Sequence, residues 1–144
     1  GVDYLHLTSN ETINGVQLRE FNKIQHDSLL IDMSSDIGSY SFEWDNIAYV
    51  YAGAQKNMGI PGVSICIGNE KYLNSDENSR YLNLGQLVEK NSLLNTPPTF
   101  SIYVLKLVTD WMIEMGGIKY FEEKSIRQSS RLYEQLQTYE EFLI

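Results

Sequence analysis

Two short apolar runs, each leading to a polar side chain, constrain the fold of this chain most. Residues 28–31 read S-L-L-I and end at Asp32, while residues 47–51 read I-A-Y-V-Y and lead through Gly53 to Lys56. Short apolar runs of this kind are typical of buried strands in a parallel sheet. We therefore predict an α/β layer structure with a mostly parallel sheet, in which Asp32 and Lys56 face one cleft from the ends of adjacent strands.

Lys56 lies in a segment that resists helix formation. From Asn46 to Gly62 the sequence reads N-I-A-Y-V-Y-A-G-A-Q-K-N-M-G-I-P-G, so Gly59, Pro61 and Gly62 follow the lysine closely. Glycine and proline favour turns, and we expect Lys56 on a tight turn at the end of a strand. A positioned, partly desolvated amine is what Schiff-base chemistry requires. Most loop lysines are simply solvated, so the neighbouring motifs must decide between the two interpretations.

Asp32 is placed where a carboxylate has a chemical use. In open α/β sheets, ligands bind at the carboxyl ends of the strands. A buried carboxylate needs a cationic partner, and a protonated pyridine nitrogen is one whose pairing also keeps the ring an electron sink. The alternative is that Asp32 caps the turn that follows it. Because Lys56 comes after one further strand, the sequence favours the functional interpretation.

Four motifs together carry a family resemblance. They are Y-A-G-A-Q-K-N-x-G around Lys56, S-N-E-T-I-x-G-V from Ser9, D-M-S-S-D from Asp32 and N-T-P-P-T-F from Asn95. In the order in which they follow one another along the chain, and in their spacing, they resemble the phosphoserine aminotransferases. Members of that family are pyridoxal-phosphate (PLP) enzymes with the aspartate-aminotransferase fold, called fold type I. The resemblance extends from Asp3 to about Tyr133. Members of the family are much longer, so we expect a central fragment.

The resemblance implies a set of site residues. The matching lysine forms the Schiff base and moves the proton, and the matching aspartate pairs with the pyridine nitrogen. Other family positions contact the cofactor ring or its phosphate, and two of these serve the partner subunit of a homodimer whose active sites lie at the interface. The residues so implied are Lys56 and Asp32 as catalytic groups, and Thr12, Asp32, Gln55, Lys56, Asn95 and Thr96 as PLP-binding groups. Taken alone, Thr12 is better interpreted as a turn or capping hydroxyl, whereas residues 95–99 are equally well interpreted as a helix start.

The implied reaction is amino transfer between phosphoserine and 2-oxoglutarate, giving 3-phosphohydroxypyruvate and glutamate, in cytoplasmic serine biosynthesis and, in some bacteria, pyridoxine synthesis. Residues 1–98 are expected to form part of the PLP-binding large domain. Residues 99–144 are expected to be helices that complete it and lead toward a C-terminal small domain. The phosphate cup, the stacking aromatic and the substrate arginines are not recognisable, so we expect the fragment alone to be inactive. Another class-V PLP enzyme and a non-catalytic interaction fragment remain alternatives.

The composition argues against several other classes of protein. Eleven basic against nineteen acidic residues give a net charge of −8 without a dense Lys/Arg cluster, which disfavours nucleic acid as a partner. No apolar run is long enough for a membrane span. His6 and His26 lack neighbours at metal-ligand spacing, so we predict structural roles and no metal site. The single Cys66, inside the strand-like residues 63–67, is expected to be a small buried hydrophobe in a reducing compartment.

Two helices are expected after residue 99. Thr99 is the expected N-cap, and a helical apolar stripe follows that we interpret as core: Phe100, Val104, Leu107, Trp111 and Met115. Gly116 and Gly117 should end this helix, and a more polar helix should follow over residues 118–136. For the chain by itself, we expect the apolar stripes over residues 100–136 to be exposed and to drive association.

The remaining segments carry weaker signals. Residues 68–90 are polar and irregular, and we expect a surface loop there. Trp44 lies between the two site strands, in a stretch where the resembled family more usually has Ser-Arg-Pro. We expect Trp44 to be a core or interface residue and not a ring stacked on the cofactor.

Overall fold

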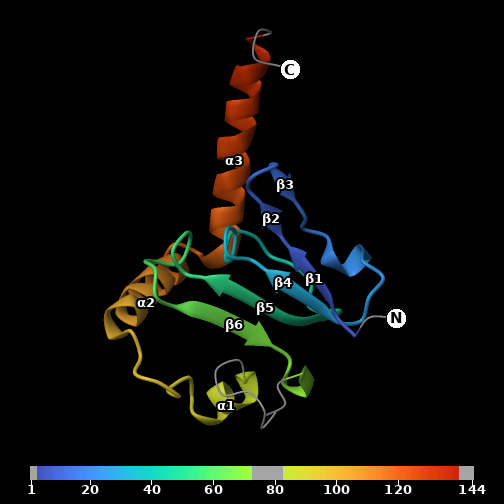
Figure 1. Ribbon diagram of the computed structural model, residues 1–144. Coiled ribbons are helices and arrows are strands. Elements are labelled where there is room, and N and C mark those ends of the chain that lie inside the picture. Colours follow the sequence, from blue (N-terminus) through green and yellow to red (C-terminus); the bar gives the residue numbers. More distant parts are fainter. Residues whose placement is uncertain (1–2, 73–82, 140–144) are drawn as a thin grey trace.

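The computed structural model describes residues 3–72 and 83–139 (Figure 1). Within these residues, the main sheet consists of β1 (Leu5–Thr8), β4 (Leu29–Asp32), β5 (Ile47–Gly53) and β6 (Ser64–Gly68), in the spatial order β1-β4-β5-β6. The first three strands are mutually parallel and β6 is antiparallel to β5. A small antiparallel hairpin, β2 (Asn10–Glu11) and β3 (Val16–Gln17), follows β1. The mostly parallel α/β architecture is as predicted.

The core lies on one face of the sheet. Leu29 and Ile31 of β4 and Val50 and Ala52 of β5 are at most 1% exposed, because alternate residues of neighbouring strands point to the same side. They pack against the 3₁₀ turn η1 (Phe21–Lys23) and against residues 33–40. The opposite face, which carries Asp32, is only half-buried. Strand β4 is therefore more amphipathic than its apolar sequence suggests.

Three helices follow the strands in the described part of the chain: α1 (Leu84–Glu89), α2 (Thr99–Glu114) and α3 (Gly117–Gln137). As predicted, α2 and α3 are separated at Gly116, whose φ of +110° is a conformation that glycine adopts without strain. The expected N-cap was wrong, because α2 begins at Thr99 itself and Pro98 occupies the cap position without a side-chain hydrogen bond. Thr99 Oγ1 instead donates to the Pro97 carbonyl at 3.4 Å.

The prediction of a loop over residues 68–90 was wrong in part. The 3₁₀ turn η2 (Glu70–Tyr72) and helix α1 both form there, and residues 73–82 lie outside the described residues. Helix α1 begins where the Asn83 side chain accepts a hydrogen bond from the Gln86 amide at 3.0 Å. An Asn N-cap with Gln three residues later is a helix-start signal that the polar composition obscured.

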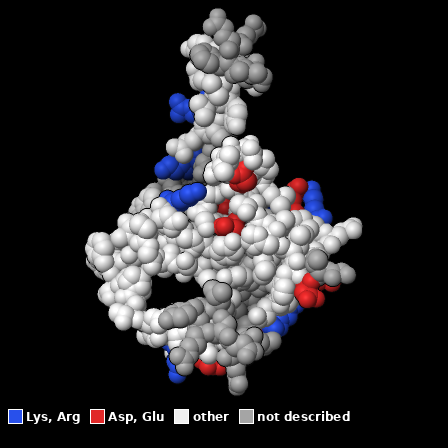
Figure 2. All heavy atoms as spheres, in the orientation of Figure 1, with Lys and Arg blue, Asp and Glu red and all other residues white. Residues whose placement is uncertain are grey.

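The apolar stripe of α2 does not form a core in this structure. Phe100 is 70% exposed, Leu107 48% and Trp111 49%, and on α2 only Met112 is buried. Figure 1 shows α3 extending away from the sheet, and the surface over α2 is almost free of charged residues in the view of Figure 2. The interpretation as core was therefore wrong here, whereas the exposure agrees with the expectation for the chain by itself.

Cys66 also differs from the expectation, because it is exposed. It lies on β6 at the edge of the sheet and points to the face opposite the core, whereas its neighbour Ile65 packs against the core. Across residues 3–72 and 83–139, no helix is both long and apolar enough to cross a bilayer. Within the same ranges, no cluster of three His, Cys, Asp or Glu side chains could hold a metal ion.

Candidate functional site

Asp32 and Lys56 leave neighbouring strands at the same edge of the sheet. Asp32 is the last residue of β4 and is paired with Tyr51 of the parallel strand β5. Strand β5 ends at Gly53, and Lys56 follows on a turn, as predicted. Lys56 is exposed, and in the described part of the chain its amine has no ion-pair partner. That both side chains face one cleft stays a prediction.

The Ser34 residue joins the ends of these two strands. Its backbone N–H donates to Asp32 Oδ1 at 2.8 Å, and its hydroxyl oxygen accepts a hydrogen bond from the Gly53 N–H at 3.1 Å. The first contact is the local turn expected from the capping interpretation of Asp32. The second ties that turn to the last residue of β5, so the carboxylate and the start of the lysine turn are held by one side chain and its backbone.

Ser35 joins the hairpin to the same place. Its hydroxyl donates to the Asn10 carbonyl at 2.8 Å and accepts from Asn10 Nδ2 at 3.0 Å. Thr12 lies in the exposed turn that follows. In this turn the Glu11 carboxylate accepts hydrogen bonds from the Ile13 and Asn14 amides at 2.8 and 2.7 Å. The hydrogen bond from the Asn14 amide, and next that from the Ile13 amide, lower the pKa of the Glu11 carboxyl. The turn with Thr12 is thereby attached to the segment that begins at Asp32.

A buried carboxylate that the sequence did not single out lies behind these contacts. Asp36 is 4% exposed and accepts a hydrogen bond from the hydroxyl of Ser9, which is fully buried, and another from Gln17 Nε2 at 3.4 Å. Burial, and next the negative charge of Asp36, raise the pKa of the neighbouring Tyr40. The signal in the sequence was the position of Asp36 at the end of D-M-S-S-D. Its partners could not be read from the sequence because they come from other segments.

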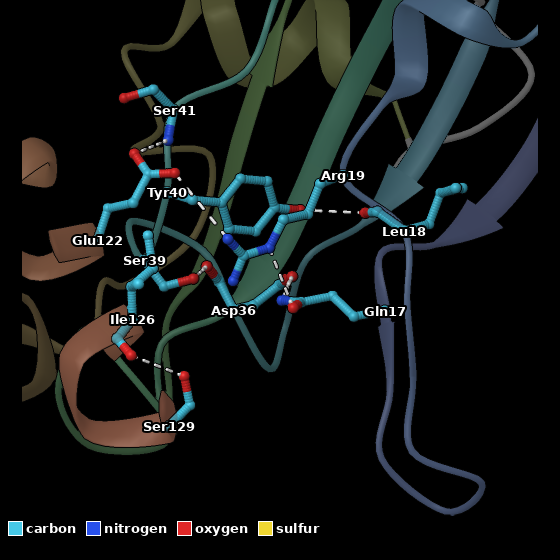
Figure 3. A network of polar contacts seen from close by, with 10 residues as sticks. All are labelled: Gln17, Leu18, Arg19, Asp36, Ser39, Tyr40, Ser41, Glu122, Ile126 and Ser129. Carbon is cyan, nitrogen blue, oxygen red and sulfur yellow. Dashed lines mark hydrogen bonds and ion pairs between the residues drawn. The ribbon is translucent and has the colours of Figure 1, made fainter. Parts of the chain in front are cut away.

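The network around Asp36 continues to helix α3 (Figure 3). The Arg19 guanidinium lies 4.7 Å from the centroid of the Tyr40 ring and 3.9 Å from Glu122 Oε1 of α3. Glu122 also accepts the Ser41 amide at 3.4 Å. The first turns of α3 are therefore connected through polar contacts to the loop that follows Asp32.

The lysine turn is also anchored on its far side. Asn57 Nδ2 donates to the Ile37 carbonyl at 2.6 Å, and the Ser101 hydroxyl of α2 donates to the Pro61 carbonyl at 2.9 Å. A Cβ added to Gly62 would lie 2.8 Å from the Ser101 hydroxyl oxygen, so turn and helix are in close contact. Lys56 is thus carried by a turn fixed between β5, the 33–40 loop and the start of α2.

Asn95 and Thr96 lie just before α2. Both are exposed, and among the described residues neither forms a hydrogen bond with Asp32 or Lys56. Their predicted role involves a second subunit and stays a prediction. Gln55, also exposed, folds its side chain back against Gly53.

Two cavities lie against strands β5 and β6. One of about 510 Å³ is lined almost wholly by apolar side chains between the core face of β5 and β6, the 33–44 loop and α2. Trp44 lines it, and its ring centroid lies 4.8 Å from that of Phe42 at an interplanar angle of 42°. Trp44 is 45% exposed, which argues against the expected core role, and the expected interface role stays a prediction. A cavity of about 240 Å³ with a mixed polar and apolar lining lies between β6 and α1.

Comparison with known proteins assigns the whole chain to one family. Residues 1–144 match the class-V aminotransferases. The phosphoserine aminotransferase of Geobacillus kaustophilus is 44% identical over 133 residues, which is 91% of this chain and 37% of that protein. The enzyme of the same name from Lactococcus lactis is 43% identical over 134 residues, with the same two shares. The chain therefore spans about 37% of the length of these curated relatives.

Solved structures agree with this assignment. A phosphoserine aminotransferase from Bacillus circulans superposes with a TM-score of 0.85 at 41% identity, covering 91% of this chain and 37% of that one. A PLP-bound phosphoserine aminotransferase from Trichomonas vaginalis gives a TM-score of 0.81 at 30% identity, covering 91% and 39%. The α/β arrangement described above is thus that of the PLP-dependent fold type I.

Proposed function

The chain belongs to the class-V aminotransferase family, and on this premise we propose that it carries part of the active site of a phosphoserine aminotransferase. The proposed reaction moves the amino group of phosphoserine to 2-oxoglutarate and yields 3-phosphohydroxypyruvate and glutamate. The observation that carries the proposal is the departure of Asp32 and Lys56 from adjacent parallel strands at one edge of the sheet. Ligands of open α/β sheets bind at such an edge.

The groups present there fit PLP. The Lys56 amine, which has no ion-pair partner among the described residues, matches the cofactor aldehyde. The Asp32 carboxylate, with Oδ1 already held by the Ser34 amide, matches a protonated ring nitrogen. The Thr12 hydroxyl and the Gln55 amide supply neutral hydrogen-bonding groups for the ring oxygen and the phosphate. When bound, PLP supplies an electron sink that stabilises negative charge at the substrate α-carbon.

The chain's own residues then have separate tasks. Lys56 Nζ would hold the cofactor through its aldehyde carbon and, when free, would move the proton at the substrate α-carbon. Asp32 keeps the ring nitrogen protonated through an ion pair, and Ser34 holds that carboxylate in one orientation. In this proposal Asn95 and Thr96 contact the cofactor phosphate in the partner subunit of a cytoplasmic homodimer.

The domain assignment is part of the same proposal. Residues 1–98 belong to the PLP-binding large domain, and residues 99–144 complete it and lead toward a small domain. The chain spans about 37% of the relatives' length, which supports its assignment to part of the large domain. In an enzyme of that size the remaining site groups must come from other segments. Serine biosynthesis is the proposed pathway, with the pyridoxine-pathway substrate as a further candidate.

The test is to locate the cofactor on the chain. The natural protein that contains this sequence is incubated with PLP, the visible absorbance of lysine-bound PLP is recorded, and borohydride reduction is followed by peptide mass mapping. We expect the reduced cofactor on Lys56, loss of the band in Lys56→Ala, and no loss in the control Lys119→Ala, whose side chain is exposed on α3. Modification of another lysine, or a band that persists in Lys56→Ala, would contradict the proposal. Amino transfer is then assayed with phosphoserine and 2-oxoglutarate.

A further inference from the structure

The face of the sheet opposite the core carries a row of polar and aromatic side chains. Asp32 of β4 is paired with Tyr51 of β5, and Leu30 is paired with both His6 of β1 and Tyr49 of β5. Because alternate residues of a strand point the same way, His6, Asp32, Tyr49 and Tyr51 share this face. None of the histidine and tyrosine side chains has a part in the function proposed above.

Two of these side chains are in direct contact. His6 Nε2 and the Tyr51 hydroxyl oxygen are 2.9 Å apart, and the two rings stack with centroids at 5.9 Å and an interplanar angle of 19°. His6 thus reaches across β4 to β5, over the strand that ends in Asp32. A structural role was predicted for His6, and the residue that it contacts is Tyr51.

Tyr51 in turn lies beside Asp32. Partial burial, then the negative charge of Asp32 and a hydrogen bond to its side chain, raise the pKa of Tyr51. Asp32 and Tyr51 are register partners on neighbouring strands, so their side chains lie next to each other on the same face. The 2.9 Å contact with the Tyr51 hydroxyl gives His6 Nε2 one hydrogen-bonding role, so it favours a single tautomer of His6.

We propose that Tyr51 is a positioning residue for Asp32, and that His6 fixes the direction of the Tyr51 hydroxyl. This rests on the proposed function, in which Asp32 pairs with the ring nitrogen of PLP. The Ser34 amide holds Asp32 Oδ1 from the loop side, and Tyr51 restrains the carboxylate from the neighbouring strand. A carboxylate held from two sides presents its charge to the ring nitrogen without first paying the entropy of rotation.

Tyr49 provides a matched control. It is two residues from Tyr51 on the same strand and face, and the two rings stack at 5.9 Å. Its hydroxyl lies 3.4 Å from Cys66 Sγ and not against Asp32. A simple surface role for aromatic side chains on this face predicts the same outcome for Tyr49→Phe and Tyr51→Phe, whereas a positioning role predicts an effect of Tyr51→Phe alone.

The first measurement uses the natural protein without PLP. Nitrogen-15 NMR of histidine side chains reports the tautomer of His6, assigned through His6→Phe. We expect a single tautomer in the parent and in Tyr49→Phe, and a mixture of tautomers in Tyr51→Phe. A mixture in the parent, or no change in Tyr51→Phe, would overturn the proposal.

The second measurement uses the same proteins saturated with PLP. Removing a group that orients a site ligand typically lowers activity by about 10–100-fold, and we expect Tyr51→Phe to lower kcat about ten-fold while the KM for phosphoserine changes less than about two-fold. His6→Phe keeps a stacked ring and should lower kcat less, with no further loss in the Tyr51→Phe background.

Three other results would count against this proposal. Equal kcat values for Tyr51→Phe and Tyr49→Phe, or additive effects of the two substitutions in the His6–Tyr51 pair, would overturn it while leaving the proposed function intact. Failure of the parent to carry PLP on Lys56 would overturn the proposed function, and this inference with it. The two failures are therefore distinguished by the absorbance of the parent protein.

Discussion

Gly62→Ala should be strongly destabilising, for two reasons that can be measured separately. The φ of Gly62 is +115°, a region that L-residues adopt at a cost of about 1–3 kcal/mol. The new Cβ would also lie 2.8 Å from the Ser101 hydroxyl oxygen, which must then rotate and give up its 2.9 Å hydrogen bond to the Pro61 carbonyl. Such a bond contributes about 0.5–1.5 kcal/mol. Together we expect a loss of about 2–4 kcal/mol in the free energy of unfolding.

The assay is equilibrium unfolding of the natural protein in urea, and stabilities are compared between variants that have the same m-value. Gly15→Ala is the backbone control, because Gly15 has a φ of +69° and no atom within 4 Å of an added Cβ, so only about 1 kcal/mol should be lost. In Gly62→Ala combined with Ser101→Ala the steric contact with the hydroxyl is absent, so Gly62→Ala should cost less in that background than in the parent. If Gly62→Ala is no more destabilising than Gly15→Ala, the described contact between the lysine turn and α2 is wrong.

Three further predictions concern the buried carboxylate, the cofactor partner and the exposed helices. Ser9→Ala removes the hydroxyl that donates to buried Asp36 and should cost about 1.5–3 kcal/mol in urea unfolding; a loss below about 0.5 kcal/mol, typical of surface sites, would contradict the described network. In the natural protein, Asp32→Asn should retain PLP but slow substrate deuterium exchange at the α-carbon, because the ring nitrogen loses its ion pair; exchange at the parent rate would refute that role. The chain by itself should self-associate through its exposed apolar helices, and Trp111→Gln should weaken this association in sedimentation velocity, whereas equal sedimentation coefficients at all concentrations would count against it.

The strands that carry Asp32 and Lys56 could be predicted from the sequence because their signals are local. An apolar run followed by a polar residue, or by glycines and a proline, is specified within about ten residues. Their adjacency also followed, since consecutive parallel strands commonly pair. The N-cap of α1 was equally local, but the polar composition around Asn83 was interpreted as a loop before its spacing to Gln86 was considered.

The errors concern properties that depend on distant parts of the molecule. Cys66 lies between two isoleucines and Trp111 belongs to an apolar stripe at helical spacing, yet both are exposed, because burial is set by what covers a strand or a helix face. Asp36 was overlooked for the same reason, since its partners Ser9 and Gln17 belong to the segment before β4. The placement of Thr12, Gln55, Asn95 and Thr96 in a PLP site remains a prediction from the family resemblance.

The antiparallel pairing of β6 with β5 sets the order in which the chain can assemble its site. This pairing joins residues 53 and 64 across the lysine turn, whereas the parallel pairings join 51 with 32 and 29 with 5. Loop-closure entropy rises with the length of chain enclosed, so among the pairings of the main sheet the β5–β6 hairpin has the lowest cost of nucleation. The turn with Lys56 can form early, and Asp32 joins it only when β4 docks. Substitutions in the turn should therefore slow refolding, while substitutions in β4 should mainly accelerate unfolding.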